Sequence, residues 1–177
     1  MTVRAHKPEF NFREKLKELD YARLPYEKMP AGSVIQTKFV TRTSDISTST
    51  ANSYTSILDM EFTPLFANSL IELYSDASYG VESGVDVQFR YVYISPDPST
   101  GTVEIERTGR FIGDDNQSQD AIPSRNNWTH YYYPNSIETR HYYYQGWKAA
   151  GPSSNRVWFH TYGSSVTTTF VIREIRQ

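Results

Sequence analysis

The sequence predicts an all-β protein, an antiparallel sandwich or barrel preceded by a short N-terminal helix and an extended arm. Beyond residue 33, nine short segments are rich in β-branched and aromatic residues, with turn residues between them and no helical periodicity. Aromatic residues make up 15% of the chain, with 14 tyrosines, and such residues favour pleated sheets. The segment 24–36 marks the point where a charged arm gives way to this pattern.

A short helix is predicted in the arm over about residues 11–20. Residues 11–14 have the spacing of a capping box, and Phe12, Leu16 and Leu19 fall on one helix face. Because isolated helices of this length are marginal in water, the helix needs a surface. That surface is either its own β domain or a neighbouring subunit or larger assembly. Prolines at positions 25 and 30 then predict a stiff, extended connector, because each disfavours helix at the preceding residue.

The predicted strands follow in order along the rest of the chain. They lie near residues 33–40, 53–62, 69–75, 84–94, 102–112, 128–133, 140–148, 155–162 and 166–175, whereas 41–52, 95–101 and 113–127 are predicted loops. Alternation is clearest over 85–93, which predicts an antiparallel strand with one face in the core. In the last strand Ile175 is out of phase with the apolar stripe, which indicates a bulge around Glu174.

Two tyrosine-rich segments, 130–133 and 141–144, repeat the same four letters with turn residues between them. They are expected to form neighbouring antiparallel strands, and three consecutive tyrosines place rings on both faces of a sheet. The second aromatic face has three competing explanations: a subunit interface, a sugar-stacking platform, or filler whose hydroxyls tolerate partial exposure. The leading explanation is a symmetric oligomer. The candidate interface or glycan-stacking residues are Trp128, Tyr131, Tyr132, Tyr133, Tyr142, Tyr143, Tyr144, Trp147 and Trp158.

Composition and motifs argue against several function classes. Without cysteine the chain has no disulfides and no thiol chemistry, and four scattered histidines offer little material for a metal site. A net charge of -2 disfavours nucleic acid as a partner, and no apolar run indicates a signal peptide or membrane insertion. Residues 163–165 lack the nucleophile-elbow pattern, and the acidic stretch 114–120 lacks EF-hand spacing. We therefore expect neither an enzyme nor a cofactor.

The run 25–36, Pro-Tyr-Glu-Lys-Met-Pro-Ala-Gly-Ser-Val-Ile-Gln, is followed by a Ser/Thr-rich stretch from Thr41 to Ser53 and a last strand ending Val171-Ile172-Arg173-Glu174-Ile175. This pattern resembles small virion structural proteins of tailed bacteriophages. The resemblance implies a jelly-roll-like antiparallel β-sandwich over residues 32–177, commonly trimeric, carried on a capsid or tail by an N-terminal anchoring arm over residues 1–31. Because the chain has no shaft of repeats or heptads, capsid decoration as a cement or head-fibre protein is favoured over a tail fibre.

Under this resemblance the arm lies across the virion surface and holds capsid or tail proteins. Its apolar anchors would be Phe10, Phe12, Leu16, Leu19, Tyr21, Leu24, Tyr26 and Met29. The protein would be assembled in the host cytoplasm and sit on the virion surface as a homo-oligomer. The alternative is a tail-fibre or carbohydrate-binding protein that recognises a host-surface glycan through its tryptophans.

Overall fold

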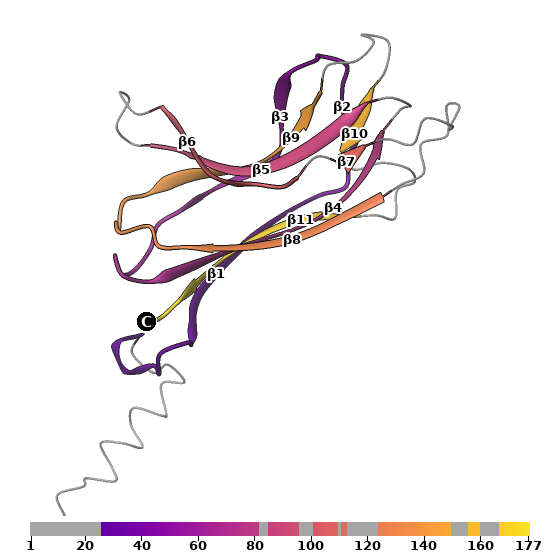
Figure 1. Ribbon diagram of the computed structural model, residues 1–177. Helices are drawn as coiled ribbons and strands as arrows, with labels where there is room; N and C mark the ends of the chain where they lie inside the picture. The colour runs from indigo at the N-terminus through magenta and orange to yellow at the C-terminus, as the bar shows by residue number, and fades with distance from the viewer. Residues whose placement is uncertain are drawn as a thin grey trace, which may run out of the picture.

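The computed structural model describes residues 26–81, 85–95, 101–109, 111–112, 124–149, 156–159 and 167–177. The arm before residue 26, with the helix expected over 11–20, lies outside these ranges. The described chain is almost entirely β, in two facing antiparallel sheets (Figure 1), so the predicted fold class is confirmed. The elements are η1 Tyr26–Lys28, β1 Val34–Arg42, β2 Ile46–Thr48, β3 Ser53–Phe62, β4 Leu70–Val81, β5 Asp86–Ile94, β6 Thr102–Arg107, β7 Phe111–Ile112, β8 Ser124–Tyr132, β9 Arg140–Lys148, β10 Val157–Phe159 and β11 Thr168–Ile175.

The strand order is that of a jelly roll. The first sheet has the order β1-β11-β4-β8, and the second has the order β3-β9-β5-β6. Four antiparallel pairs are nested along the chain: β1 pairs with β11, β3 with β9, β4 with β8 and β5 with β6. The two strands of each later pair lie, in sequence, between the two strands of the pair before it. A long antiparallel ribbon folded over on itself gives this double Greek key. The short strands β2 and β10 extend the first sheet, and β7 pairs with β5 in the second.

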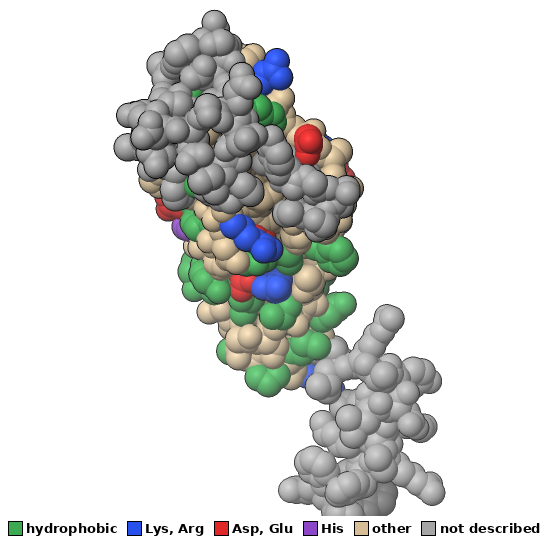
Figure 2. Space-filling model, turned by 90° about the vertical axis from the view of Figure 1, so that its right-hand side faces the viewer, with side chains coloured by type: hydrophobic (Ala, Val, Ile, Leu, Met, Phe, Trp, Pro, Cys, Tyr) green, Lys and Arg blue, Asp and Glu red, His purple; other side chains and the backbone are tan. Residues whose placement is uncertain are grey.

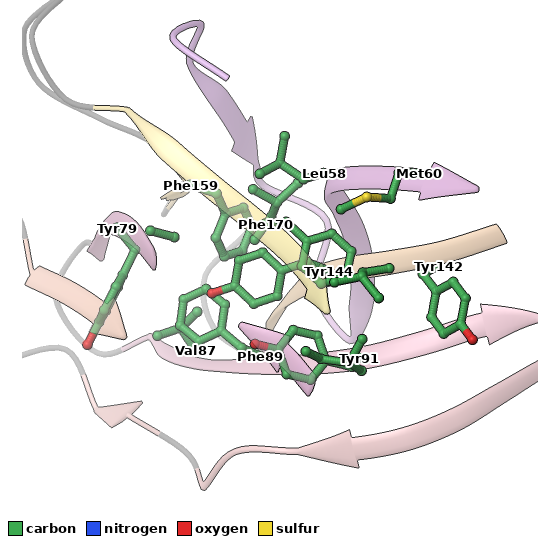
Figure 3. Packing of buried hydrophobic residues seen from close by; sticks show 14 of the residues in the cluster. Leu58, Met60, Tyr79, Val87, Phe89, Tyr91, Tyr142, Tyr144, Phe159 and Phe170 are labelled. Atoms are coloured by element: carbon green, nitrogen blue, oxygen red, sulfur yellow. The ribbon is translucent and has the colours of Figure 1, made fainter. Parts of the chain in front are cut away.

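Aromatic rings from both sheets fill the space between the layers (Figure 3). The Phe89 ring stacks on Tyr144 with centroids 5.6 Å apart, and Tyr91 stacks on Phe170 at 5.7 Å. Offset stacking of this kind adds about 0.5–1.5 kcal/mol per pair beyond the burial of apolar area. Gly146 leaves room for the Phe159 ring, since a Cβ at position 146 would lie 2.1 Å from it.

The core tyrosines keep hydrogen-bond partners for their hydroxyl groups. The Tyr91 hydroxyl lies 2.8 Å from both the Ser75 Oγ and the Trp128 carbonyl oxygen. The Tyr144 hydroxyl accepts a hydrogen bond from the Asn126 amide at 2.9 Å. Burial raises the pKa of both phenols far above the usual value, because an ionised phenolate would be poorly solvated there. The hydroxyl groups of Tyr91 and Tyr144 therefore keep their hydrogen bonds in the core as long as they stay neutral.

Several expected strand boundaries shift in the structure. The predicted strand 102–112 is divided into β6 and β7, and β8 begins within the expected loop 113–127. β2 lies inside the expected loop 41–52. The first four residues of β8, Ser-Arg-Asn-Asn, are all polar, and β2 has only three residues, so hydrophobic alternation gives no signal for either.

The expectation that the two tyrosine segments pair with each other is wrong. Tyr131 and Tyr132 belong to β8 in the first sheet, whereas residues 141–144 belong to β9 in the second. The connection 133–139 crosses from one sheet to the other instead of turning back within a hairpin. The segments still meet across the core, where the Tyr132 and Tyr142 hydroxyls are hydrogen-bonded to each other.

The two ends of the sandwich differ. At one end lie η1, the start of β1, the connections 63–69 and 133–139, and the C-terminus (Figure 1). We call this end the arm end, because Tyr26, the first described residue, lies there. The last residues of β4 and β9, Val81 and Lys148, lie at the opposite end of the sandwich.

Candidate attachment surface at the arm end

The root of the arm, residues 26–33, is tied to the end of β11. A single turn, η1, is closed by the Met29 amide donating to the Tyr26 carbonyl at 3.2 Å. The chain then turns at Gly32, whose φ of 86° favours glycine. The Gly32 amide donates to the Arg176 carbonyl at 2.7 Å, and the Arg176 amide donates to the Ser33 carbonyl at 2.9 Å. These two bonds continue the β1–β11 ladder beyond the strands themselves.

The side chain of Arg176 adds a clamp on the same segment. Its Nη1 donates to the Tyr26 carbonyl at 2.9 Å and also to the Met29 carbonyl. A guanidinium is a permanent charge, and hydrogen bonds to charged groups contribute about 1.5–3 kcal/mol each when they are shielded from water. The clamp holds the arm root, residues 26–33, at the end of β11.

A buried carboxylate organises the neighbouring connection, residues 63–69. Glu174 on β11 is fully buried and accepts hydrogen bonds from the Leu65 and Phe66 amides, all at 2.9 Å. Gln36 on β1 lies beside it and donates to the Thr63 carbonyl at 2.9 Å and to the Glu174 carboxylate at 3.4 Å. Buried carboxylates are tolerated only with such partners, so the connection and the strand ends stabilise one another.

The sequence predicts a bulge around Glu174 but no role for that residue. The structure places the bulge in the partner strand β1, where the register shifts between Val34 and Gln36 opposite the Glu174–Ile175 step. β11 itself keeps its alternation, with Phe170, Ile172 and Glu174 pointing inward. A charged residue at an inward position of a regular strand is the sequence signal that could have identified the hydrogen bonds between Glu174 and the connection 63–69.

Exposed apolar side chains gather at the arm end. Among the described residues, six of the eight exposed large hydrophobic side chains lie there: Tyr26, Val34, Leu65, Ile94, Tyr133 and Ile137. Beside the clamp is a shallow pocket of about 170 Å³, lined by Phe66, Asn68, Ser69, Arg176 and Gln177. Clusters of exposed apolar residues on an otherwise polar protein mark surfaces that bind a partner.

Two of the eight expected anchoring residues, Tyr26 and Met29, are among the described residues at the arm end. Tyr26 is exposed and Met29 is half-buried, both at the Arg176 clamp. The other six, Phe10, Phe12, Leu16, Leu19, Tyr21 and Leu24, lie outside the described residues. Their role as anchors stays a prediction.

The nine candidate interface or glycan-stacking residues do not form one platform. Tyr142 and Tyr144 are fully buried in the sandwich core, so their rings are not available to a partner. Trp128 is also occupied internally, stacked on Tyr91 with centroids 4.1 Å apart and planes 5° apart. Tyr132 points inward with them. The sequence does not show which of these aromatic residues are buried, because inward and outward rings alternate along each tyrosine-rich segment.

The remaining five candidates lie on three different surfaces. Tyr131 and Trp158 lie on the outer face of the first sheet, where Tyr131 is exposed and Trp158 is half-buried on β10 opposite Gly80. Tyr133 is exposed at the arm end. Tyr143 and Trp147 are half-buried on the outer face of the second sheet. There Tyr143 stacks on His141 at 4.7 Å, and Trp147 lies 6.3 Å from Tyr54.

The outer face of the second sheet carries a connected polar network. Arg90 donates to Gln145 at 2.9 Å, pairs with Glu104 at 3.2 Å, and lies over the Tyr54 ring at 3.3 Å. Arg107 pairs with the same carboxylate at 2.6 Å. Although partial burial pushes the pKa of Glu104 upward, hydrogen bonds from Arg107 and Arg90 outweigh it and lower the pKa. The carboxylate is thus kept ionised as a hub for two arginines.

Within the described ranges, no three histidine, aspartate or glutamate side chains lie together in a way that could hold a metal ion. No helix in those ranges is long and apolar enough to cross a membrane.

Comparisons with known proteins bear on the fold. No family model matches the chain, and no curated protein matches it. Among solved structures, the chain is similar to one from the VP2 subviral particle of infectious bursal disease virus, with a TM-score of 0.50 at 9% identity over 81% of this chain and 34% of that one. A chain of the T13 particle of the same virus gives a TM-score of 0.45 at 8% identity, over 81% and 36% of the two chains. The chain spans about a third of the length of these viral proteins, and the likeness is one of fold.

Proposed function

We propose that this chain is a structural protein of a virus particle and not an enzyme, and that it acts as a trimeric capsid decoration protein of a tailed bacteriophage. The observation that carries the proposal is the arm end, where six exposed apolar side chains lie at the same end of the sandwich as the clamp of Arg176 on the arm root. The jelly roll fits the role, as its fold is shared by a chain of a viral particle. The resemblance of the segment 25–36 to phage virion proteins adds the choice of virus class.

Attachment would use the arm as a tether and the arm end as its base. Residues 1–31 would lie across the particle, with their apolar side chains against capsid proteins, while the opposite end of the sandwich faces outward. Three arms per trimer would bind together, so that modest single contacts combine through effective concentration into durable attachment. The clamp at Arg176 supports this mechanism because it holds Tyr26 and Met29, the residues that follow the arm, against the end of β11.

The experiment compares incorporation of arm variants into particles. We expect deletion of residues 2–23, or the double change Leu16→Asn and Leu19→Asn, to reduce the amount of chain in purified virions by at least tenfold. Loss of the apolar stripe removes the contact surface but leaves the sandwich intact, which circular dichroism checks.

A matched control is the double change Lys17→Asn and Glu18→Asn, which alters two neighbouring polar positions and keeps the net charge. This double variant should enter virions in the same amount as the unmodified chain. Undiminished incorporation of the deletion variant would remove the arm from the mechanism.

The alternative is a tail-fibre or receptor-recognition protein that binds a host-surface glycan. Trp147 favours it, because its indole is half-buried on the outer face of the second sheet beside Tyr54 and the Arg90 network. An aromatic ring flanked by hydrogen-bonding side chains is suited to stacking on a sugar. Binding of the purified chain on a glycan array, lost on Trp147→Ala, would select this function over decoration.

A further inference from the structure

We infer that the outer face of the first sheet, centred on Phe39, is where a second copy of this chain packs. This inference rests on the oligomer in the proposed function and names the surface that forms it. We call the surface the Phe39 face and define it by Phe39 on β1, Val171 on β11, Tyr74 on β4 and Tyr131 on β8.

Four strands bring these side chains together. Phe39 is paired with Val171, and Val171 is paired with Tyr74, so the three lie in one row across the sheet. Tyr131 lies in the adjacent row, opposite Glu72. Phe39 is 68% exposed and Tyr131 is 51% exposed, although both are held in long strands. A rigid platform that presents large rings to water is typical of an interface core.

The charged groups of this face are already paired within the chain. Glu72 is bound by the Arg173 guanidinium and by the Tyr131 hydroxyl, the latter at 3.1 Å. Asp76 receives two hydrogen bonds from Arg125, at 2.6 and 2.5 Å. Burying an unpaired charge at an interface is costly, whereas these groups enter a contact with their partners in place. The face can therefore be covered without leaving a carboxylate or guanidinium of these two pairs unsatisfied.

The same pairing makes the face self-compatible. Its two acidic and two basic side chains cancel, so neither a polyanion nor a strongly basic partner finds complementary charge there. A second copy presents the same neutral, aromatic surface, so no unbalanced charge on either copy opposes their contact. Figure 2 shows this character on the lower half of the molecule, where hydrophobic side chains surround blue and red side chains in contact with each other.

The open edge of the same sheet, strand β1, is protected against pairing with a strand of another chain. β1 is bonded only to β11 among the described strands, which leaves an open edge. That edge carries the bulge between Val34 and Gln36, and Lys38 reaches across to the Glu61 carbonyl on β3 at 2.7 Å. Bulges and inward-directed lysines discourage the addition of a further strand. A second copy is therefore expected to dock on the face rather than extend the sheet.

The test is the association of the purified full chain, measured by sedimentation equilibrium over a range of concentrations. We expect Phe39→Ala to weaken association by about 30-fold or more, as for an interface hot spot, and Phe39→Glu to give a monomer. Because Phe39 is mostly exposed in the single chain, both variants should keep the circular dichroism spectrum of the folded protein.

Ile137→Glu is the matched control, because Ile137 is 59% exposed but lies at the arm end. It should associate as the unmodified chain does. The inference is overturned if the unmodified chain is a monomer at about 100 µM, if both Phe39 variants associate normally, or if Ile137→Glu dissociates the oligomer instead. Since the measurement needs no virion, its outcome is independent of whether the arm attaches to one.

Discussion

At the scale of single residues, buried tyrosine hydroxyls give the molecule a defined response to alkali. Burial raises the pKa of Tyr91, Tyr132, Tyr142 and Tyr144, with the mutual contact of Tyr132 and Tyr142 as a further influence. In the unfolded chain the same phenols ionise near pH 10. Above that pH the unfolded state binds fewer protons than the folded state, so stability is fully present below pH 10 and is lost as the pH rises further.

We predict that each buried tyrosine lowers the free energy of unfolding by about 1.4 kcal/mol per pH unit above pH 10. Urea denaturation at pH 8, 10 and 11 measures the slope. Tyr132→Phe removes one ionisable phenol and should make the slope shallower by that amount. A free energy of unfolding that stays constant up to pH 11 would show that these phenols are not buried in the way described.

At the scale of elements, Glu174 joins the end of β11 to the connection 63–69. We predict that Glu174→Ala destabilises the fold by about 1–3 kcal/mol, because the Leu65 and Phe66 amides lose their acceptor in a partly buried place. Chemical denaturation measures the change. Glu61→Ala, at an exposed position of β3, is the control and should lie within about 0.5 kcal/mol of the unmodified chain. Equal stability of the two variants would contradict the structural role of Glu174.

The elements also show what the sequence can and cannot predict. Strands with strict alternation, such as β5, and those with continuous aromatic content, such as β9, were found within two residues of their ends. Alternation reports which residues point inward but not which strand lies alongside, so the partners of β8 and β9 were assigned wrongly. Pairing across the jelly roll joins residues as far apart as β1 and β11, and no local pattern records such contacts.

The candidate site was predicted only in outline for the same reason. The proline-bracketed connector predicts strands from residue 33 onward, and β1 begins at Val34. Its clamp by Arg176 depends on residues 147 or more positions away along the chain. The fold distributes the candidate aromatic residues among the core, two sheet faces and the arm end. Phe39, the most exposed large hydrophobic side chain among the described residues, is not one of the predicted site residues.

At the scale of the whole molecule, attachment would use the arm end and self-association would use the Phe39 face. The arm end combines the clamped arm root, the C-terminus and the exposed apolar side chains, whereas the Phe39 face is directed sideways from the same sheet. Attachment and self-association would then use separate surfaces. A trimer could form through its sheet faces while all three arms point toward one surface, which is the arrangement that combined attachment requires.

Electron microscopy of intact virions that contain this chain tests the account most directly. We predict threefold density in which each jelly roll stands on the particle with its arm end inward and its N-terminal residues continuing across the capsid surface. Density in which the sandwich contacts the particle through its opposite end, with the arm directed into solvent, would contradict the account.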